Sequence, residues 1–405
     1  MKTSENWLGR ELTLNIEKVA HGGIFVARHE GRVVFVTGAI TGEQVIARVF
    51  EDKGGAFCRA EVLRVIDPSA HRVKHFWKAV RERGAGGAEF GHIDLEYQRE
   101  LKADVLEEAL DRFAGVKLRV PVEAAPGDIE RNGLGYRTRV KLHVDEFGTA
   151  GPVRERSHEV VVSGELPLAV DDIRELELHK KNWSGVSKLE IATSNTGQVQ
   201  YLVDGKVNGD QRLLERVAGR TFRVSAGGFW QVHREAPQLL AGTVIEMCEQ
   251  AGFDVAANNL DLYGGVGLFA GALVNHFGSD TRFTTVESFR KASDDAKLNL
   301  ADLKNVKVVC APTEKFLRQL ISAEPAGLGN ATVVIDPPRS GAGGGVVRDL
   351  LALRPQHIVY VACDPIALAR DLKGLLADYN LATIRAFDLF PHTHHLEAVA
   401  SLVRK

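Results

Sequence analysis

Hydrophobic and polar residues alternate along the first part of the chain. Between residues 10 and 67, β-type runs are separated by turn sequences that contain glycine. Such a series suits a small closed barrel of the oligonucleotide-binding type, and we predict a barrel domain over residues 1–67. A structural β-domain without a ligand fits the same pattern. The runs are ELTLNIEKVA, GIFVARHEG, RVVFVTGAI, EQVIARVFED and AFCRAEVLRVI.

The pattern changes at residues 67–73, which break the strand series and predict a linker. Residues 95–113 carry apolar side chains at helical spacing and predict a long amphipathic helix. Strand-type segments follow at 136–146 and 199–207. We therefore expect a central α+β domain over residues 68–225.

Strand-type and helical segments alternate from about residue 253 onwards. This alternation predicts an α/β fold, with a mostly parallel sheet that helices cover on both faces. Ligands of such sheets bind at the carboxyl ends of the strands. We assign residues 226–405 to this domain. Its strand-type segments are NNLDLYG, RFTTVES, VKVVCAP, ATVVIDPP, HIVYVACDP, TIRAFDLF and AVASLVR.

Composition narrows the class of protein. The 405 residues exceed what one hydrophobic core usually supports, so two or three domains are expected. The N-terminus has no apolar signal region and no run of about 18 apolar residues occurs, so we expect no membrane span. The four cysteines lie far apart, as in a cytoplasmic chain with free thiols. With a net charge of −2, the chain could bind nucleic acid only through a local basic surface.

Two neighbouring strand ends carry a glycine-rich turn and an acid. The first strand ends in Asp261 and a turn with Gly265 and Gly267, and the next strand ends in Glu287. Glycines let a ligand approach the backbone, and the acid can accept both ribose hydroxyls of a nucleoside cofactor. Because Ala270 stands where a dinucleotide motif has its third glycine, we prefer S-adenosylmethionine over NAD. A tight turn without a ligand is the remaining alternative.

Two further strand ends carry an acid and a thiol. Asp336 precedes two prolines, which make a rigid corner where a flat heterocycle could be hydrogen-bonded. Cys363 ends the following strand and should face the same crevice. A free cysteine is usually a small buried hydrophobe, and we expect this of Cys58, Cys248 and Cys310. The position of Cys363 instead predicts a catalytic thiol.

Basic residues alternate along the segment at 136–146. Arg137, Arg139 and Lys141 should share one strand face beside the ring of Tyr136. Such a face can hold phosphates and stack a base, which makes Arg137 and Arg139 candidate substrate-binding residues for RNA. A solvated charged edge is the alternative.

Taken in order, these motifs resemble the S-adenosylmethionine-dependent RNA 5-methyluridine methyltransferases, which comprise bacterial tRNA and 23S rRNA uridine-C5 enzymes. The resemblance covers nearly the whole chain, and the combination of motifs is highly specific. The N-terminal runs look like the TRAM domain, an RNA-binding barrel that many members carry. The remaining motifs are GGFWQVH, DLYGGVGLFA, IDPPRSG, VACDPIALARDL and FPHTHHLE.

The resemblance implies a role for each candidate residue. Phe229 would lie against the target uracil, and Asp336 would bind the edge of that base. Cys363 would be the nucleophile and Glu397 the general base. S-adenosylmethionine would be held by Gln231, Asp261, Gly265, Gly267, Glu287 and Asp336.

The implied activity is methyl transfer to C5 of a specific uridine in RNA through a covalent adduct between Cys363 and C6. TRAM-bearing members mostly act on 23S rRNA, so we favour rRNA over tRNA. A tRNA enzyme and an inactive RNA-binding protein on the same scaffold are the alternatives. An amino methyltransferase would need no thiol. We expect a Rossmann-like class I methyltransferase domain behind an OB-like TRAM barrel, and a monomer.

The chain departs from the family pattern at several positions. Many relatives hold an iron–sulfur cluster through cysteines just after the barrel, where this chain has Ala85 and Ala88. Because such clusters need thiolates, we expect none. His233 and Asp364 replace family asparagines and could alter uracil or loop contacts. The histidines within 391–395 could bind zinc, but the family places this loop beside the general base, so we expect no metal.

Overall fold

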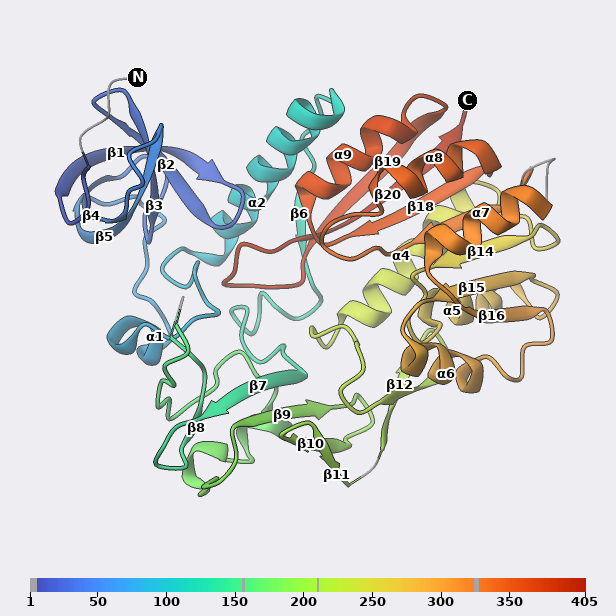
Figure 1. Ribbon diagram of the computed structural model, residues 1–405, viewed down its shortest axis with the longest axis horizontal. Helices are drawn as coiled ribbons and strands as arrows, with labels where there is room; N and C mark the ends of the chain where they lie inside the picture. Colours follow the sequence, from blue (N-terminus) through green and yellow to red (C-terminus); the bar gives the residue numbers. More distant parts are fainter. Residues whose placement is uncertain (1–5, 155–156, 210, 324–327) are drawn as a thin grey trace.

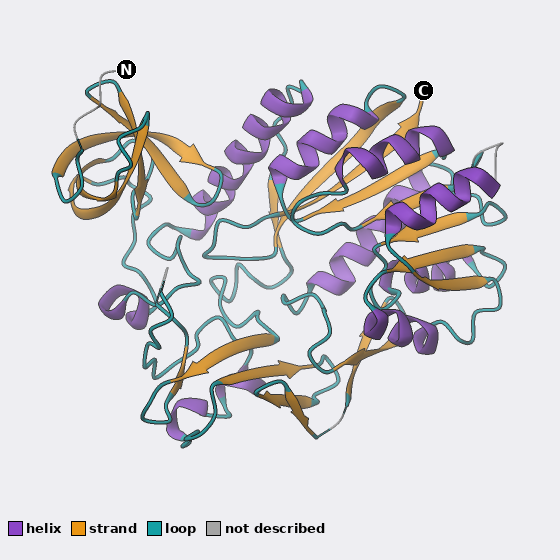
Figure 2. Cartoon of the chain, viewed as in Figure 1, coloured by secondary structure: helices purple, strands orange, loops and turns teal. Residues whose placement is uncertain are grey.

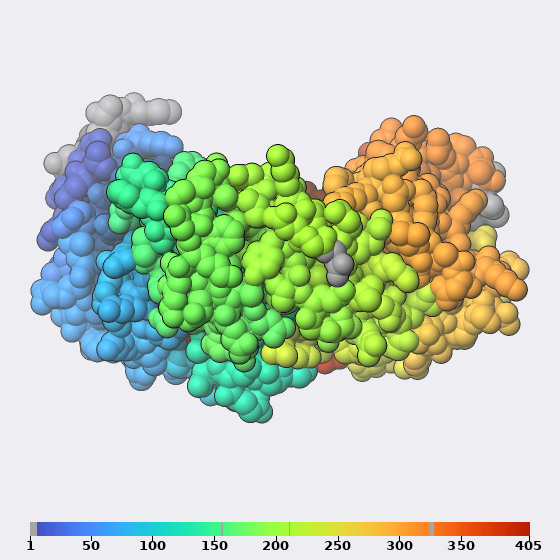
Figure 3. All heavy atoms as spheres, turned by 90° about the horizontal axis from the view of Figure 1, so that it is seen from below, coloured from blue at the N-terminus to red at the C-terminus, as the bar shows by residue number. Residues whose placement is uncertain are grey.

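Three parts follow one another along the chain, which the structure describes over residues 6–154, 157–209, 211–323 and 328–405. In the computed structural model, a barrel lies at the N-terminal end, a β-rich part in the middle, and a large sheet carries the C-terminus (Figure 1). Helices gather mainly around this last sheet (Figure 2). Seen from below, the middle part joins the other two (Figure 3). Within the described ranges, no helix is both long and apolar enough to span a membrane.

The first part is a closed five-stranded barrel, which confirms the expectation from the alternating pattern. Its strands are β1 (Glu11–Ala20), β2 (Ile24–His29), β3 (Arg32–Thr37), β4 (Gln44–Glu51) and β5 (Phe57–Asp67). They pair in the order β1-β2-β3-β5-β4, and apolar side chains such as Phe25 and Val34 fill the interior. The same core includes Phe90 and Leu101 from later in the chain, so the barrel is packed against its neighbours.

The middle part is built on a five-stranded sheet with the order β11-β10-β9-β7-β8. Its elements are α1 (Lys78–Arg83), β7 (Arg139–Val144), β8 (Ala150–Gly151), α3 (Asp171–Arg174), the 3₁₀ turn η2 (Leu178–Lys180), β9 (Lys188–Thr193), β10 (Val199–Val203) and β11 (Lys206–Asn208). Asp204 and Gly205 both have positive φ angles, +48° and +77°, and join β10 to β11. This Asp-Gly pair is a strong hairpin signal.

The C-terminal sheet has eight strands in the order β16-β15-β14-β17-β18-β20-β19-β6. These are β6 (Val122–Ala124), β14 (Asn259–Leu262), β15 (Phe283–Glu287), β16 (Val306–Cys310), β17 (Thr332–Ile335), β18 (His357–Ala362), β19 (Tyr379–Asp388) and β20 (Glu397–Arg404). The strands from β14 to β18 are parallel, whereas β20 is antiparallel to both of its neighbours. The carboxyl ends of the parallel strands therefore meet at one edge.

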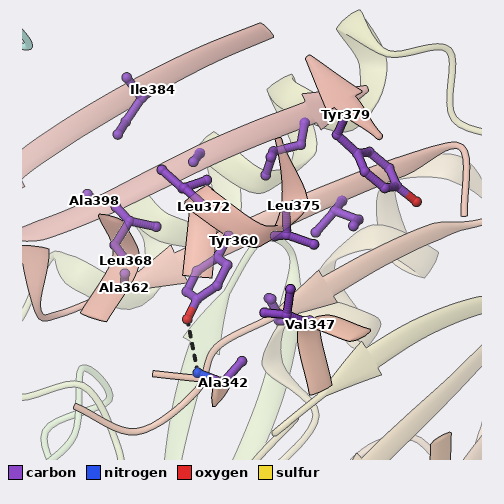
Figure 4. Close-up of a cluster of buried hydrophobic side chains, with 14 of the residues drawn as sticks. Ala342, Val347, Tyr360, Ala362, Leu368, Leu372, Leu375, Tyr379, Ile384 and Ala398 are labelled. Carbon is purple, nitrogen blue, oxygen red and sulfur yellow. Dashed lines mark hydrogen bonds between the residues drawn. The ribbon is translucent and has the colours of Figure 1, made fainter. Parts of the chain in front are cut away.

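Helices cover both faces of this sheet. One face carries α2 (Leu95–Ala109), the π-helical turn η1 (Leu110–Ala114), α7 (Thr313–Ala323), α8 (Gly343–Leu353) and α9 (Pro365–Leu375). The other face carries α4 (Ala236–Gln250), α5 (Leu268–Phe277) and α6 (Arg290–Asn299). In the first core, the buried Tyr360 hydroxyl accepts from the Ala342 amide at 3.1 Å (Figure 4). The same hydroxyl donates to Asp371 at 2.6 Å, so its burial leaves no polar atom without a partner.

Several elements within residues 68–225 pack against the C-terminal sheet. Helix α2 and strand β6 lie within 68–225, but they pack in the core of the C-terminal sheet. The hairpin of β12 (Arg212–Val217) and β13 (Arg220–Ser225) likewise contacts α6 and buries Phe222 in the second core. Periodicity along the sequence identifies a helix or strand, but it does not show which sheet that element will cover.

Candidate active site

Four candidate residues converge at the carboxyl edge of the C-terminal sheet. Asp261, Asp336 and Cys363 lie at the ends of β14, β17 and β18, which are neighbouring parallel strands. Glu397 begins β20, which runs antiparallel to β18 with Ala362 paired to Ala398, so Glu397 lies beside Cys363. The fold thus brings together a thiol and three carboxyl groups that are far apart in the sequence.

Burial and negative charge shape the acid–base properties of this cluster. Burial, followed by the charges of Glu397 and Asp336, raises the pKa of the Cys363 thiol to about 12. Burial, followed by the charge of Asp336, holds the pKa of Glu397 well above its usual range. The guanidinium of Arg339 opposes both shifts. Arg339 follows the two prolines after Asp336, and its position in the sequence gave no sign of this role.

The raised pKa of Cys363 predicts slow alkylation at neutral pH. Only the thiolate reacts, so the rate should rise about tenfold per pH unit up to the thiol pKa. We expect iodoacetamide to modify Cys363 more slowly than the thiol of a short peptide, as followed by peptide mass spectrometry. Asp336→Asn removes a negative neighbour and should accelerate the reaction. Equal rates in the two proteins would contradict the assigned electrostatic coupling.

Asp336 should reduce stability when it is ionised. Burial, followed by the charge of Asp261, raises its pKa to about 7. A raised carboxyl pKa means that the folded state disfavours the ionised form, so stability is lost as pH rises from the unfolded pKa towards 7. We expect Asp336→Asn to raise Tm at about pH 8, and the gain to shrink as the pH falls towards about 4. Asp280→Asn, at an exposed position, is the control and should change Tm little at either pH.

Asp261 supports the glycine-rich turn from beneath. Its side chain is fully buried, and Oδ2 accepts from the Ala270 amide at 3.3 Å and the Thr285 hydroxyl at 3.1 Å. A Cβ on Gly264 would lie 2.8 Å from Asp261 Oδ2, so this close approach requires glycine. Oδ1 is buried and has no hydrogen-bond partner among the described residues. Burial raises the pKa of Asp261 to about 7. Because Oδ1 has no partner among the described residues, it is available to a hydrogen-bond donor of a ligand.

Glu287 folds back onto the same turn. Its Oε2 accepts from the Gly265 amide at 3.1 Å, and Oε1 accepts from the Phe289 amide at 2.6 Å. Gly267 has a φ of +88°, and a Cβ there would lie 2.7 Å from Leu300. The turn therefore presents bare backbone beside a carboxylate. A nucleoside fits this cradle, because ribose hydroxyls are suitable donors to the carboxylate.

The segment between β13 and α4 carries Phe229 and Gln231. The Phe229 side chain is 70% exposed, which is unusual for a large aromatic residue in a folded domain. Arg139 donates from Nη1 to the Gly228 carbonyl at 2.8 Å and so ties this segment to β7. An exposed aromatic ring on a tethered backbone can stack a base without first leaving a core.

A cavity of about 430 Å³ lies beside this segment, in the middle part of the molecule. Arg137, Arg139 and Lys141 line it together with Phe229, and so do Val140 and Leu142 from strand β7. Its remaining walls are mainly apolar. Within the described chain, the buried Nε and Nη2 of Arg139 have no hydrogen-bond partner, and burial lowers the pKa of its guanidinium to about 10. Arg139 thus keeps two buried nitrogens that could bond an anionic or carbonyl-bearing ligand, while its Nη1 donates to the Gly228 carbonyl.

Tyr136 does not belong to this face, contrary to the expected aromatic platform. Its ring is completely buried and stacks on His233, with ring centroids 5.0 Å apart, and its hydroxyl donates to the Pro391 carbonyl at 3.2 Å. His233 in turn lies 2.9 Å from Asp128 through Nε2. Arg137 Nε donates to the Tyr136 hydroxyl at 3.3 Å, so these two residues contact each other while tertiary packing buries the tyrosine ring. His233, which stands at a position where the family has asparagine, therefore makes a buried structural contact.

Two histidines of the segment at 391–395 also have protein partners. His392 lies within 3.2 Å of Gln98 Nε2 and 2.9 Å of the Asn132 carbonyl. His394 lies 3.4 Å from Glu89. In the part of the chain that the structure describes, no group of three His, Cys, Asp or Glu side chains is arranged to hold a metal ion.

The remaining cysteines differ in their exposure, and Ala85 and Ala88 stand where many relatives have cysteines. Cys58 and Cys248 are buried as expected, but Cys310 is exposed, because β16 is the edge strand of the sheet. Ala85 and Ala88 are buried in an apolar cluster with Trp77, Tyr136, Val161 and Leu168. Methyl and aromatic groups thus occupy the region expected for an iron–sulfur cluster, and these side chains do not suit such a group.

Comparisons with known proteins assign both ends of the chain. Residues 188–405 match the tRNA (uracil-5-)-methyltransferase family, and residues 7–63 match the TRAM domain. A Streptomyces avermitilis protein described as an uncharacterized RNA methyltransferase is 37% identical, covering 98% of this chain and 98% of its own length. A Bifidobacterium longum protein with the same description is 36% identical and covers 96% of each chain.

Among solved structures, the chain is similar to the tRNA (uracil-54, C5)-methyltransferase of Pyrococcus abyssi in complex with S-adenosyl-L-homocysteine. The TM-score is 0.74 at 23% identity, over 96% of this chain and 99% of that chain. At this level of identity the likeness concerns the fold, and it extends over nearly the whole chain.

Proposed function

The chain belongs to the tRNA (uracil-5-)-methyltransferase family and is an RNA methyltransferase. From this premise we propose that it methylates C5 of a specific uridine in rRNA through a covalent bond between Cys363 and C6. The observation that carries the proposal is the convergence of Cys363, Asp336 and Glu397 at one sheet edge. A thiol with a buried acid beside it is what a uracil-C5 methylation requires.

The proposed mechanism follows from the weakness of C5 as a nucleophile. The Cys363 thiol first loses its proton to solvent, and the thiolate then adds to C6. The electron pair of the C5–C6 double bond moves to C5 and O4 to give an enolate. S-adenosylmethionine, when bound, would supply an electrophilic methyl group on its sulfonium; C5 takes this methyl group, and S-adenosylhomocysteine is the leaving group. Glu397 then accepts the C5 proton, and the released electron pair re-forms the C5–C6 bond and expels the Cys363 thiolate.

Asp336 and the cofactor cradle complete the proposed assignment. With its pKa raised to about 7, Asp336 can present a neutral carboxyl that donates to the uracil edge and stabilises charge on O4. We assign S-adenosylmethionine to the cradle of Asp261, Gly265, Gly267 and Glu287, with further contacts from Gln231 and Asp336. Two observations support this assignment: Oδ1 of Asp261 has no hydrogen-bond partner among the described residues, and the glycine turn at 264–267 exposes its backbone to a ligand.

We place the RNA across the middle part of the molecule. Phe229 stacks on the target uracil, and nucleotides beside the target enter the cavity lined by Arg137 and Arg139. The unpaired Nε and Nη2 of Arg139 support this placement, because a guanidinium fork suits phosphate or base carbonyl oxygens.

Arg139→Ala should weaken RNA binding about tenfold, or about 1.4 kcal/mol. If Arg139 contacts a phosphate, the salt slope of binding should also fall by about 0.7–0.9. Fluorescence titrations of RNA at several salt concentrations measure both quantities. Lys206→Ala, on an exposed side chain of the same sheet, is the control. An unchanged RNA affinity for Arg139→Ala would place the RNA elsewhere.

We favour rRNA as the substrate, with tRNA as the alternative, and we propose a cytoplasmic monomer without an iron–sulfur cluster. The TRAM match supports an RNA substrate but does not distinguish the two RNA classes. Mapping of 5-methyluridine in rRNA and tRNA from a strain that lacks this gene tests the proposal. We expect one rRNA position to lose its methyl group, whereas a loss confined to tRNA would assign the enzyme to tRNA. No change in either RNA would favour the inactive RNA-binding alternative.

A further inference from the structure

A turn of the barrel reaches the residue that follows the proposed nucleophile. His21 lies between β1 and β2, and its Nε2 is 2.9 Å from Oδ2 of Asp364. Asp364 directly follows Cys363 in the chain. The contact therefore joins two parts of the chain that are 343 residues apart in the sequence.

Both oxygens of the Asp364 carboxylate are engaged. Oδ1 accepts from the Ala367 amide at 2.8 Å and caps helix α9, while Oδ2 faces His21. Burial favours the neutral carboxyl, but the hydrogen bonds from His21 and Ala367 hold the pKa of Asp364 below its usual value. Pro365 then fixes the first turn of the helix. The backbone that leaves Cys363 is thus held by the helix cap on one side and by the barrel on the other.

The same turn packs against the segment that leads to Glu397. Gly23 has a φ of +72°, and a Cβ there would lie 2.8 Å from Cβ of His394. His394 is also paired with Glu89 at 3.4 Å. Residues 21–23 therefore contact both segments that carry the proposed nucleophile and base.

We propose that His21 is a positioning residue of the active site, which aligns Cys363 for attack on C6 by holding Asp364 in place. The inference rests on the proposed function, in which Cys363 is the nucleophile. A near-attack arrangement tolerates little displacement of the reacting atom. The barrel then contributes to the rate of the chemical step and is more than an anchor for RNA.

Two substitutions of His21 test whether the hydrogen bond to Asp364 is what matters. In His21→Gln the amide nitrogen takes the place of Nε2 and can still donate to Asp364, whereas in His21→Asn it takes the place of Nδ1 and falls short. We expect His21→Asn to lower the single-turnover rate at saturating RNA and S-adenosylmethionine by about ten- to a hundredfold, and His21→Gln to restore most of it. RNA affinity should remain unchanged in both variants.

Asp364→Ser removes the partner of His21 but keeps the helix cap, because the serine hydroxyl can cap helix α9 but does not reach His21. In this background His21→Asn should cause no further loss of rate. Arg28→Ala removes an exposed cation from β2 without touching either active-site segment, and should leave the saturated rate unchanged.

Three outcomes would overturn the inference: an unchanged rate in His21→Asn, weaker RNA binding with an unchanged saturated rate, or additive losses in the double variant. The second outcome would make His21 an RNA contact. Formation of a denaturation-resistant adduct between wild-type protein and 5-fluorouridine RNA serves as the reference. If the wild type forms no adduct, the proposed function fails; if wild type and His21→Asn form it equally fast, only the role of His21 fails.

Discussion

Cys363→Ala should lower the rate of uridine methylation on the order of 10⁶-fold, the scale on which loss of a catalytic nucleophile acts. Without the thiolate, C6 receives no electron pair and C5 remains too weak a nucleophile. Binding of S-adenosylmethionine should persist, because the proposed cradle lies on β14 and β15. Incorporation of a labelled methyl group and calorimetric cofactor binding measure the two effects.

Cys310→Ser is the matched control for this result. Cys310 is an exposed thiol at the end of another strand of the same sheet, and its loss should leave methylation unchanged. Substantial methylation by Cys363→Ala would remove the covalent mechanism and revive the amino methyltransferase alternative, which needs no thiol.

Glu397→Gln should stop the reaction after methyl transfer. Glutamine cannot accept the C5 proton, so the Cys363–C6 bond cannot be eliminated and the protein–RNA adduct should accumulate. Turnover should fall by about 10²–10⁴-fold, the usual contribution of a general base. A denaturing gel with labelled RNA shows the adduct directly. Full turnover by Glu397→Gln, with no adduct, would assign the base to another residue.

Much of the fold could be predicted from the sequence, because local periodicity and turn residues decide the elements. The barrel follows from alternating runs separated by glycine turns, and the parallel sheet follows from alternating strands and helices. The packing partners of α2 and β6 could not be predicted, since β6 joins and α2 covers a sheet whose other strands begin more than a hundred residues later. Periodicity contains no information about such distant partners.

The candidate site shows the same division between local and distant information. Strand ends in a parallel sheet meet at one edge, so Asp261, Asp336 and Cys363 could be grouped from the sequence. Tyr136 illustrates the limit, because its position beside basic residues gave no sign that His233 and the Pro391 carbonyl would bury it. The contact of His21 with Asp364 depends on how the barrel docks, and only the three-dimensional structure contains that information.

The most direct test of the central claim is mass spectrometry of the protein after reaction with S-adenosylmethionine and RNA that carries 5-fluorouridine at the target. Fluorine cannot leave C5 as the proton does, so the bond between Cys363 and C6 cannot be eliminated and the adduct persists. The account predicts a protease-derived peptide that contains Cys363 and carries the methylated 5-fluorouridine nucleotide. An adduct on another residue, or none while ordinary RNA is methylated at full rate, would contradict it.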